Sequence, residues 1–115
     1  MAISEAFQAS ATIGATEFFL ASNSITVADQ TVDGVYQLLL ELNALANGDE
    51  FRVRLYEAVS AAGTRRIVEE WVISGLQGTP NWFTPSFILL HKWEFSITKL
   101  LGTDRAIAWS IRKVA

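Results

Sequence analysis

The sequence predicts an all-β protein: an antiparallel two-sheet sandwich, jelly-roll-like, of about seven to eight strands. Two observations favour this fold class. Apolar and polar residues alternate in several segments of strand length, and turn residues separate these segments at short intervals. The 115 residues include no cysteine, so we expect one domain that is stabilised by its core and not by disulfides.

The last quarter of the chain shows the clearest alternation, in predicted strands at 93–100 and 105–114. The turn at 102–104 lies between them, which predicts an antiparallel β-hairpin with one apolar face. This register also sets Glu94 opposite Arg112, so the charge pattern supports the same pairing. The predicted apolar pairs are Trp93 with Ile111, Phe95 with Trp109, and Ile97 with Ile107.

A second hairpin is predicted from the strands 51–59 and 66–73, with its turn at 61–63. Its register places side chains of the same kind opposite one another. The predicted pairs are Phe51 with Ile73, Val53 with Trp71, Arg54 with Glu70, and Tyr56 with Val68.

Residues 35–42 fit two structures. As a strand, the segment places Tyr36, Leu38, Leu40 and Leu42 on one face. A helix over 35–45, ending near Gly48, would also have an apolar stripe. The strand is favoured because the turn at 47–49 then leads directly into the strand at 51–59.

The remaining segments have weaker patterns. Residues 1–16 are interpreted as an N-terminal arm or a weak first strand, and 17–115 as the sandwich domain. Short strands are expected at 17–20, 25–27 and 87–90. Both prolines of the chain lie in 75–85, which is predicted to be the crossover between the two hairpins.

Composition argues against several classes of partner. The net charge is -3 and the basic residues are scattered, so we expect no nucleic acid partner. No apolar stretch reaches the roughly 18 residues of a membrane span, and the start has no signal-peptide pattern, so we expect no membrane partner. Hydrophobic residues make up 50% of the chain, which suggests buried contacts with other subunits.

The residues offer little chemistry, and we expect no enzyme activity, no catalytic or metal site and no cofactor. His91 is the single histidine, and the adjacent acids Glu69 and Glu70 would point to opposite faces of a strand. The aspartates lie in turn contexts, where their side chains bond to nearby backbone amides. No phosphate-binding glycine loop is present.

Trp82 and Phe83 are the candidate contact residues, because they lie in a proline-bounded segment where large apolar rings need covering. Three interpretations stay open. The rings could cover the core, anchor a partner protein, or stack against sugars as in a carbohydrate-binding module.

Several turn and strand patterns together resemble small β-sandwich virion proteins of tailed bacteriophages. The resemblance runs from about residue 12 to the end of the chain. The patterns are Asp33-Gly34-Val35-Tyr36-Gln37, Ala46-Asn47-Gly48-Asp49, Arg54-Leu55-Tyr56-Glu57, Gly63-Thr64-Arg65-Arg66, and Gly102-Thr103-Asp104-Arg105 before Trp109.

The resemblance implies a non-enzymatic capsid decoration or cement protein that binds the outer capsid lattice. Its partner would be the major capsid protein, and it would act as a homo-oligomer such as a trimer. It would reside on the capsid surface of the virion and assemble in the host cytoplasm. Phe7, Trp82 and Phe83 are the expected contacts. A head-tail connector or tail component and a carbohydrate-binding module are the alternatives.

Overall fold

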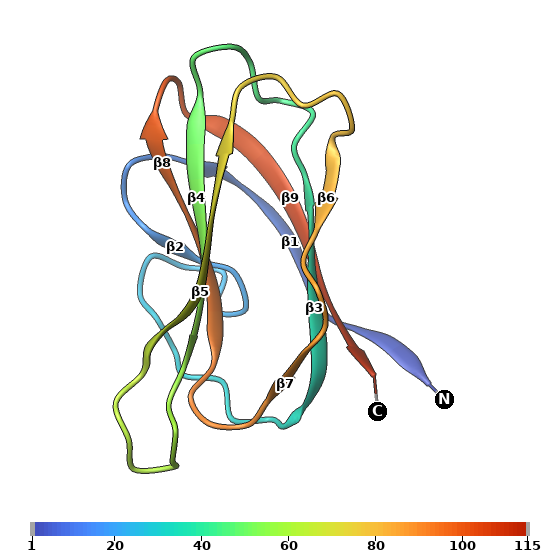
Figure 1. Ribbon diagram of the computed structural model, residues 1–115, viewed down its shortest axis with the longest axis vertical. Helices are drawn as coiled ribbons and strands as arrows, with labels where there is room; N and C mark the ends of the chain where they lie inside the picture. Colours follow the sequence, from blue (N-terminus) through green and yellow to red (C-terminus); the bar gives the residue numbers. More distant parts are fainter. Residues whose placement is uncertain (1, 115) are drawn as a thin grey trace.

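The computed structural model describes residues 2–114 as two antiparallel sheets that stand side by side in Figure 1. Sheet A has the strand order β1-β9-β3-β6, with β7 also paired to β3, and sheet B has the order β2-β8-β4-β5. The predicted all-β sandwich is confirmed, with nine strands in the described chain instead of seven or eight. The strands are β1 (Ile3–Ile13), β2 (Phe18–Phe19), β3 (Gly34–Glu41), β4 (Glu50–Glu57), β5 (Arg66–Ser74), β6 (Asn81–Phe83), β7 (Phe87–Leu89), β8 (Glu94–Leu101) and β9 (Arg105–Val114).

The core lies between the inward faces of the two sheets, as the alternation predicts. In β3, in β4 as far as Leu55, and in β9, the buried residues alternate, because successive side chains point to opposite faces of a strand. In β8, by contrast, all five residues from Glu94 to Thr98 are buried. The central part of the core consists of Tyr36, Leu38 and Leu40 from β3, Ile107, Trp109 and Ile111 from β9, Phe51, Val53 and Leu55 from β4, and Phe95 and Ile97 from β8.

The predicted hairpin of the last quarter is wrong. β8 pairs with β2 and β4 in sheet B, whereas β9 pairs with β1 and β3 in sheet A. The turn at 102–104 carries the chain from one sheet to the other, so Glu94 and Arg112 are not partners. Alternation specifies which side chains face inward, and two strands facing each other across a core satisfy it as well as a hairpin does.

The hairpin of β4 and β5 is confirmed for most of its length. A bulge between Leu55 and Tyr56 shifts the register, so Tyr56 lies opposite Ile67 and the predicted pair with Val68 is wrong. The confirmed pairs are Phe51 with Ile73, Val53 with Trp71, and Arg54 with Glu70, whose side chains form an ion pair at 2.7 Å.

Residues 34–41 form a strand, so the helical alternative is excluded, and Tyr36, Leu38, Leu40 and Leu42 are all buried. Residues 3–13 form the long edge strand β1, which pairs with β9. The crossover at 75–85 leads from sheet B to sheet A and contains β6, which pairs with the end of β3. The segment 25–27 forms no strand.

Candidate interaction surface

The outer face of sheet A carries a row of apolar side chains across four strands. Val35 pairs with Val114 and Ile88, and Val114 pairs with Ile3. Directly opposed residues point to the same face, and the neighbouring Tyr36 is buried in the core, so this row faces outward. Ile3 is 69% exposed and Ile88 is 85% exposed. We call Ile3, Val114, Val35 and Ile88 the outer apolar row.

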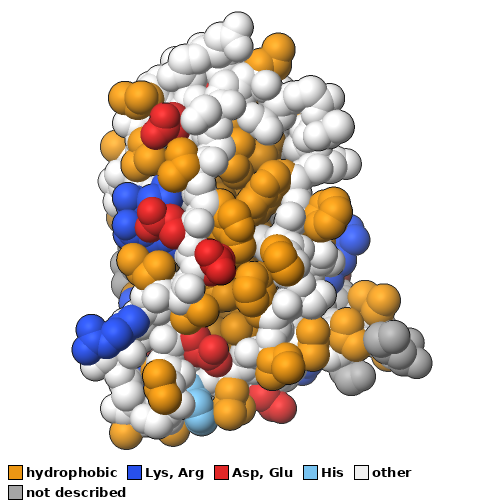
Figure 2. Space-filling model, viewed as in Figure 1, with side chains coloured by type: hydrophobic (Ala, Val, Ile, Leu, Met, Phe, Trp, Pro, Cys, Tyr) orange, Lys and Arg blue, Asp and Glu red, His pale blue; other side chains and the backbone are white. Residues whose placement is uncertain are grey.

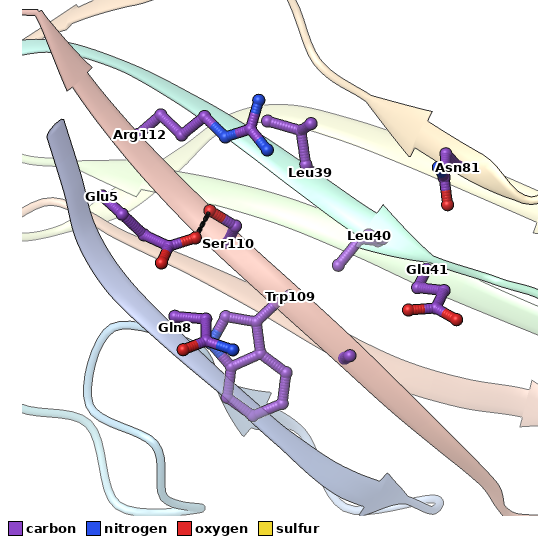
Figure 3. Close-up of a pocket in the computed structure, with 10 residues that line it drawn as sticks. Glu5, Gln8, Leu39, Leu40, Glu41, Asn81, Trp109, Ser110 and Arg112 are labelled. Carbon is purple, nitrogen blue, oxygen red and sulfur yellow. Dashed lines mark hydrogen bonds between the residues drawn. The ribbon is translucent and has the colours of Figure 1, made fainter. Parts of the chain in front are cut away.

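A shallow groove of about 220 Å³ crosses the same face farther along the strands (Figure 3). Leu39 is one of its lining residues, and it pairs with Phe83 and Ser110 on the two neighbouring strands. Phe83 is 64% exposed. The Ser110 hydroxyl donates a hydrogen bond to Glu5, as the dashed line in Figure 3 marks. The polar side chains around the groove are Glu5, Gln8, Glu41, Asn81 and Arg112.

A second hollow, of about 140 Å³, lies beside the outer apolar row. Ile3, Val35 and Val114 line it together with Arg112, which also borders the first groove. Arg112 lies between Glu5 of β1 and Gln37 of β3. The outer face of sheet A therefore combines an apolar row with a neighbouring polar groove.

The three predicted contact residues occupy different environments. Phe7 points into the sandwich and packs edge-on against Trp93, with 6.1 Å between ring centroids. Trp82 also points inward and is partly buried against the core, whereas its neighbour Phe83 is exposed on the outer face of sheet A. The position of Trp82 corresponds to the interpretation in which its ring covers the core.

Trp82 belongs to an aromatic cluster at the side of the sandwich where β5 and β6 are the edge strands. Figure 2 shows apolar side chains running down this side between the two sheets. The centroid of the Trp71 ring lies 5.7 Å from that of Trp82 and 6.0 Å from that of Phe87. The two indole planes are inclined by 77°, so these rings do not form the flat platform on which a sugar stacks.

Asp49 organises one end of the sandwich. Its carboxylate accepts hydrogen bonds from the Ala46 N–H at 2.9 Å, the Thr103 N–H at 3.1 Å and Arg105 Nε at 2.7 Å. The bond from Arg105, followed by those from the two backbone amides, lowers the pKa of Asp49 to about 2. The bond from Ala46 is the turn chemistry that the sequence predicts for this aspartate. The contacts with Thr103 and Arg105, beside the β8–β9 turn, are visible only in the tertiary structure.

Glu94 is fully buried, although the sequence pattern places it on the polar face of a hairpin. Its carboxylate accepts hydrogen bonds from the backbone N–H groups of Ala21 at 2.8 Å, Ser22 at 2.9 Å and Phe95 at 2.8 Å. The Ser22 hydroxyl donates a fourth bond at 2.7 Å. Burial raises the pKa of Glu94, while these four bonds act in the opposite direction. Glu94 therefore holds the loop after β2 against the sheet.

His91 and the remaining acidic residues of the described chain form no candidate metal site. Among residues 2–114, no three His, Asp or Glu side chains converge closely enough to hold a metal ion. The backbone N–H of His91 donates to Glu57 at 3.2 Å, and its carbonyl accepts from the Ala58 N–H at 2.9 Å. The described chain has no helix with the length and apolarity that crossing a membrane requires.

Comparison with known proteins yields no family. No family model matches the chain, and no curated protein matches it. The fold is similar to a solved protein of the Bacillus endospore appendages, which are described as a novel family of disulfide-linked pili. That similarity has a TM-score of 0.46 at 18% identity and covers 98% of this chain and 87% of the other. A similarity at this level assigns no function.

Proposed function

We propose that this protein is a non-enzymatic structural subunit, and more specifically a capsid decoration protein of a tailed bacteriophage. The outer apolar row is the observation that carries the proposal. Side chains such as Ile88, at 85% exposure, remain in water in the isolated chain. Covering them with a partner lowers the free energy of the complex, because apolar surface is removed from water. The sequence resemblance to phage virion proteins supplies the partner, which is the major capsid protein.

The rigid sandwich suits this role. Outer face residues of β1, β9 and β3 have fixed relative positions because the pairing register sets them, so the face is preformed for docking. Many copies, each bound weakly, would stabilise a lattice through the sum of their contacts. In this proposal the protein resides on the capsid surface after assembly in the host cytoplasm.

Co-sedimentation with phage capsids that lack this protein tests the proposal. We expect the unmodified chain to bind and Ile88→Asp to lose binding, because a carboxylate in the apolar row would have to be desolvated. Val59→Asp is the matched control, since Val59 is 101% exposed and lies outside sheet A. Absence of binding by the unmodified chain, or an equal loss for both variants, would contradict the proposal.

Copy number separates the decoration role from the connector or tail role. A protein that decorates the lattice is present in many copies per particle, whereas a ring at the head-tail junction contributes the subunits of one ring. Quantitative mass spectrometry of purified particles measures this ratio. A copy number equal to one ring per particle would favour the connector or tail role over the decoration role. Absence from the particle would refute both roles.

A further inference from the structure

The two sheets have four edges, and β1 is the edge without protection. Exposed edges usually carry charges, proline or bulges, or are short, because unpaired backbone groups recruit other strands. β2 has two residues, and Pro85 separates β6 from β7. β5 carries Arg66, Glu69 and Glu70 and a bulge.

The 7–13 part of β1 differs on each of these points. β1 has 11 residues, and its segment 7–13, Phe-Gln-Ala-Ser-Ala-Thr-Ile, contains no charge, proline or glycine. Within the described residues β1 pairs with β9 alone, so its other side presents unpaired N–H and C=O groups. Its single bulge lies between Glu5 and Phe7, before the uncharged segment begins.

We propose that β1 pairs antiparallel with β1 of a second copy of this chain, about a twofold axis at Ser10. The pairing would join two A sheets into one continuous sheet across the dimer. This inference rests on the proposed function and deepens it, because it names the edge through which the structural subunit first assembles. A twofold dimer replaces the trimer that the sequence resemblance suggests.

The segment is complementary to itself in this register. Inward-facing residues meet inward-facing residues, with an aromatic ring against a β-branched side chain and alanine against alanine. Outward-facing polar residues meet outward-facing polar residues, which is a favourable arrangement for hydroxyl and amide groups. The pairs are Phe7 with Ile13, Gln8 with Thr12, Ala9 with Ala11, and Ser10 with Ser10.

Registers shifted by two residues match less well. An axis at Ala9 places the charged Glu5 opposite Ile13, and the bulge turns these two side chains to opposite faces. An axis at Ala11 extends the pairing to Gly14, whose carbonyl already accepts the Lys99 N–H at 2.9 Å from sheet B. The axis at Ser10 pairs the full uncharged segment and opposes no like charges.

Cysteine cross-linking tests both the edge and the register, because the chain has no native cysteine. Ser10→Cys would set two thiols directly opposite each other, with Cα atoms within the roughly 4.4–6.8 Å that a disulfide requires. We expect this variant to form a covalent dimer under mild oxidation. Gln8→Cys is the matched control, because the axis separates its two copies by four residues, or about 13 Å.

A mixture of Gln8→Cys and Thr12→Cys should cross-link, since these residues are opposite each other in the proposed register. A monomer of the unmodified chain in light scattering, or a dimer of Ser10→Cys that forms no cross-link, would overturn the proposal. So would a dimer in which Gln8→Cys cross-links with itself as readily as Ser10→Cys.

Charge substitution gives a second, independent measurement. Ser10 is exposed, so Ser10→Lys should fold normally, yet it places two ammonium groups across the axis and should weaken dimerisation about tenfold or more. Mixing it with Ser10→Glu should restore the dimer. Val68→Lys, at an exposed position of the β5 edge, should leave the dimer unchanged.

The same variants separate this inference from the proposed function. If Ser10→Lys is as dimeric as the unmodified chain, the β1 pairing is wrong whatever the capsid assay shows. If Ser10→Cys cross-links as expected while the unmodified chain does not sediment with capsids, the pairing stands and the capsid role fails.

Discussion

Replacing Gly102 with alanine should destabilise the protein much more than replacing Gly48. Both glycines have a left-handed backbone, with φ of +92° at Gly102 and +93° at Gly48. A Cβ at Gly48 meets no atom within 4 Å, whereas a Cβ at Gly102 would overlap Asp49 Oδ1 and come within 2.8 Å of Asp49 Cα. The two substitutions therefore share the cost of backbone strain and differ in the clash.

The expected magnitudes follow from these two terms. Left-handed backbone costs an alanine roughly 1–2 kcal/mol, which a stiffer unfolded chain offsets by roughly 0.4–1 kcal/mol, so Gly48→Ala should lose about 1 kcal/mol. Forcing backbone apart in a packed region adds about 1–3 kcal/mol, so Gly102→Ala should lose about 2–4 kcal/mol. The clash involves the Asp49 backbone, which a change of side-chain rotamer does not relieve.

Urea denaturation followed by tryptophan fluorescence measures both free energies of unfolding. Hydrogen exchange at the Thr103 amide supplies a local readout, since this N–H is bonded to Asp49 and should lose protection in Gly102→Ala alone. Equal losses of stability for the two variants would refute the argument that Asp49 packs against the β8–β9 turn.

Three further predictions concern single side chains. The pKa of Asp49 is about 2 in the folded protein and about 4 in the unfolded chain, so the carboxylate stabilises the fold above about pH 4, and this contribution is lost as the pH falls through about 2. The free energy of unfolding, measured from pH 5 to pH 2, should fall with pH, and Asp49→Asn should reduce this slope. Glu94→Ala should cost on the order of 3 kcal/mol by urea denaturation, because three backbone N–H groups lose their acceptor; unchanged stability would show that they find other partners. Trp82→Ala should cost about 2 kcal/mol and Phe83→Ala less than about 0.5 kcal/mol in thermal unfolding, and the reverse order would contradict their assigned faces.

The candidate surface was predictable only in part. Phe83 lies on the outer face of sheet A, within a segment that prolines mark as unusual. Ile88 and Val35 carry no sequence signal of exposure, because an apolar residue in a strand is expected in the core until its face is known. Their position on the outer face follows from pairing between strands that are distant in the chain.

Phe7 and Glu94 also have environments that their own sequence neighbourhoods do not predict. An aromatic residue in an N-terminal segment of weak pattern suggests an exposed contact, but the pairing of β1 with β9 turns Phe7 toward Trp93. A glutamate on an alternating strand suggests solvent, but the loop after β2 covers Glu94 and supplies three of its four hydrogen bonds. Each environment is created by another segment, so neither is encoded in the residue's own neighbourhood.

The sequence by itself determined that this is a β protein and which face of each central strand points into the core, because side-chain alternation has the period of the strand. It also determined the β4–β5 hairpin, whose turn and cross-strand pairs are local. Only the tertiary structure decided that β8 and β9 belong to different sheets, because an apolar face can be covered equally well by a neighbour in the same sheet or by one across the core. Which backbone hydrogen bonds form depends on how all nine strands of the described chain pack together, and that is a property of the whole fold.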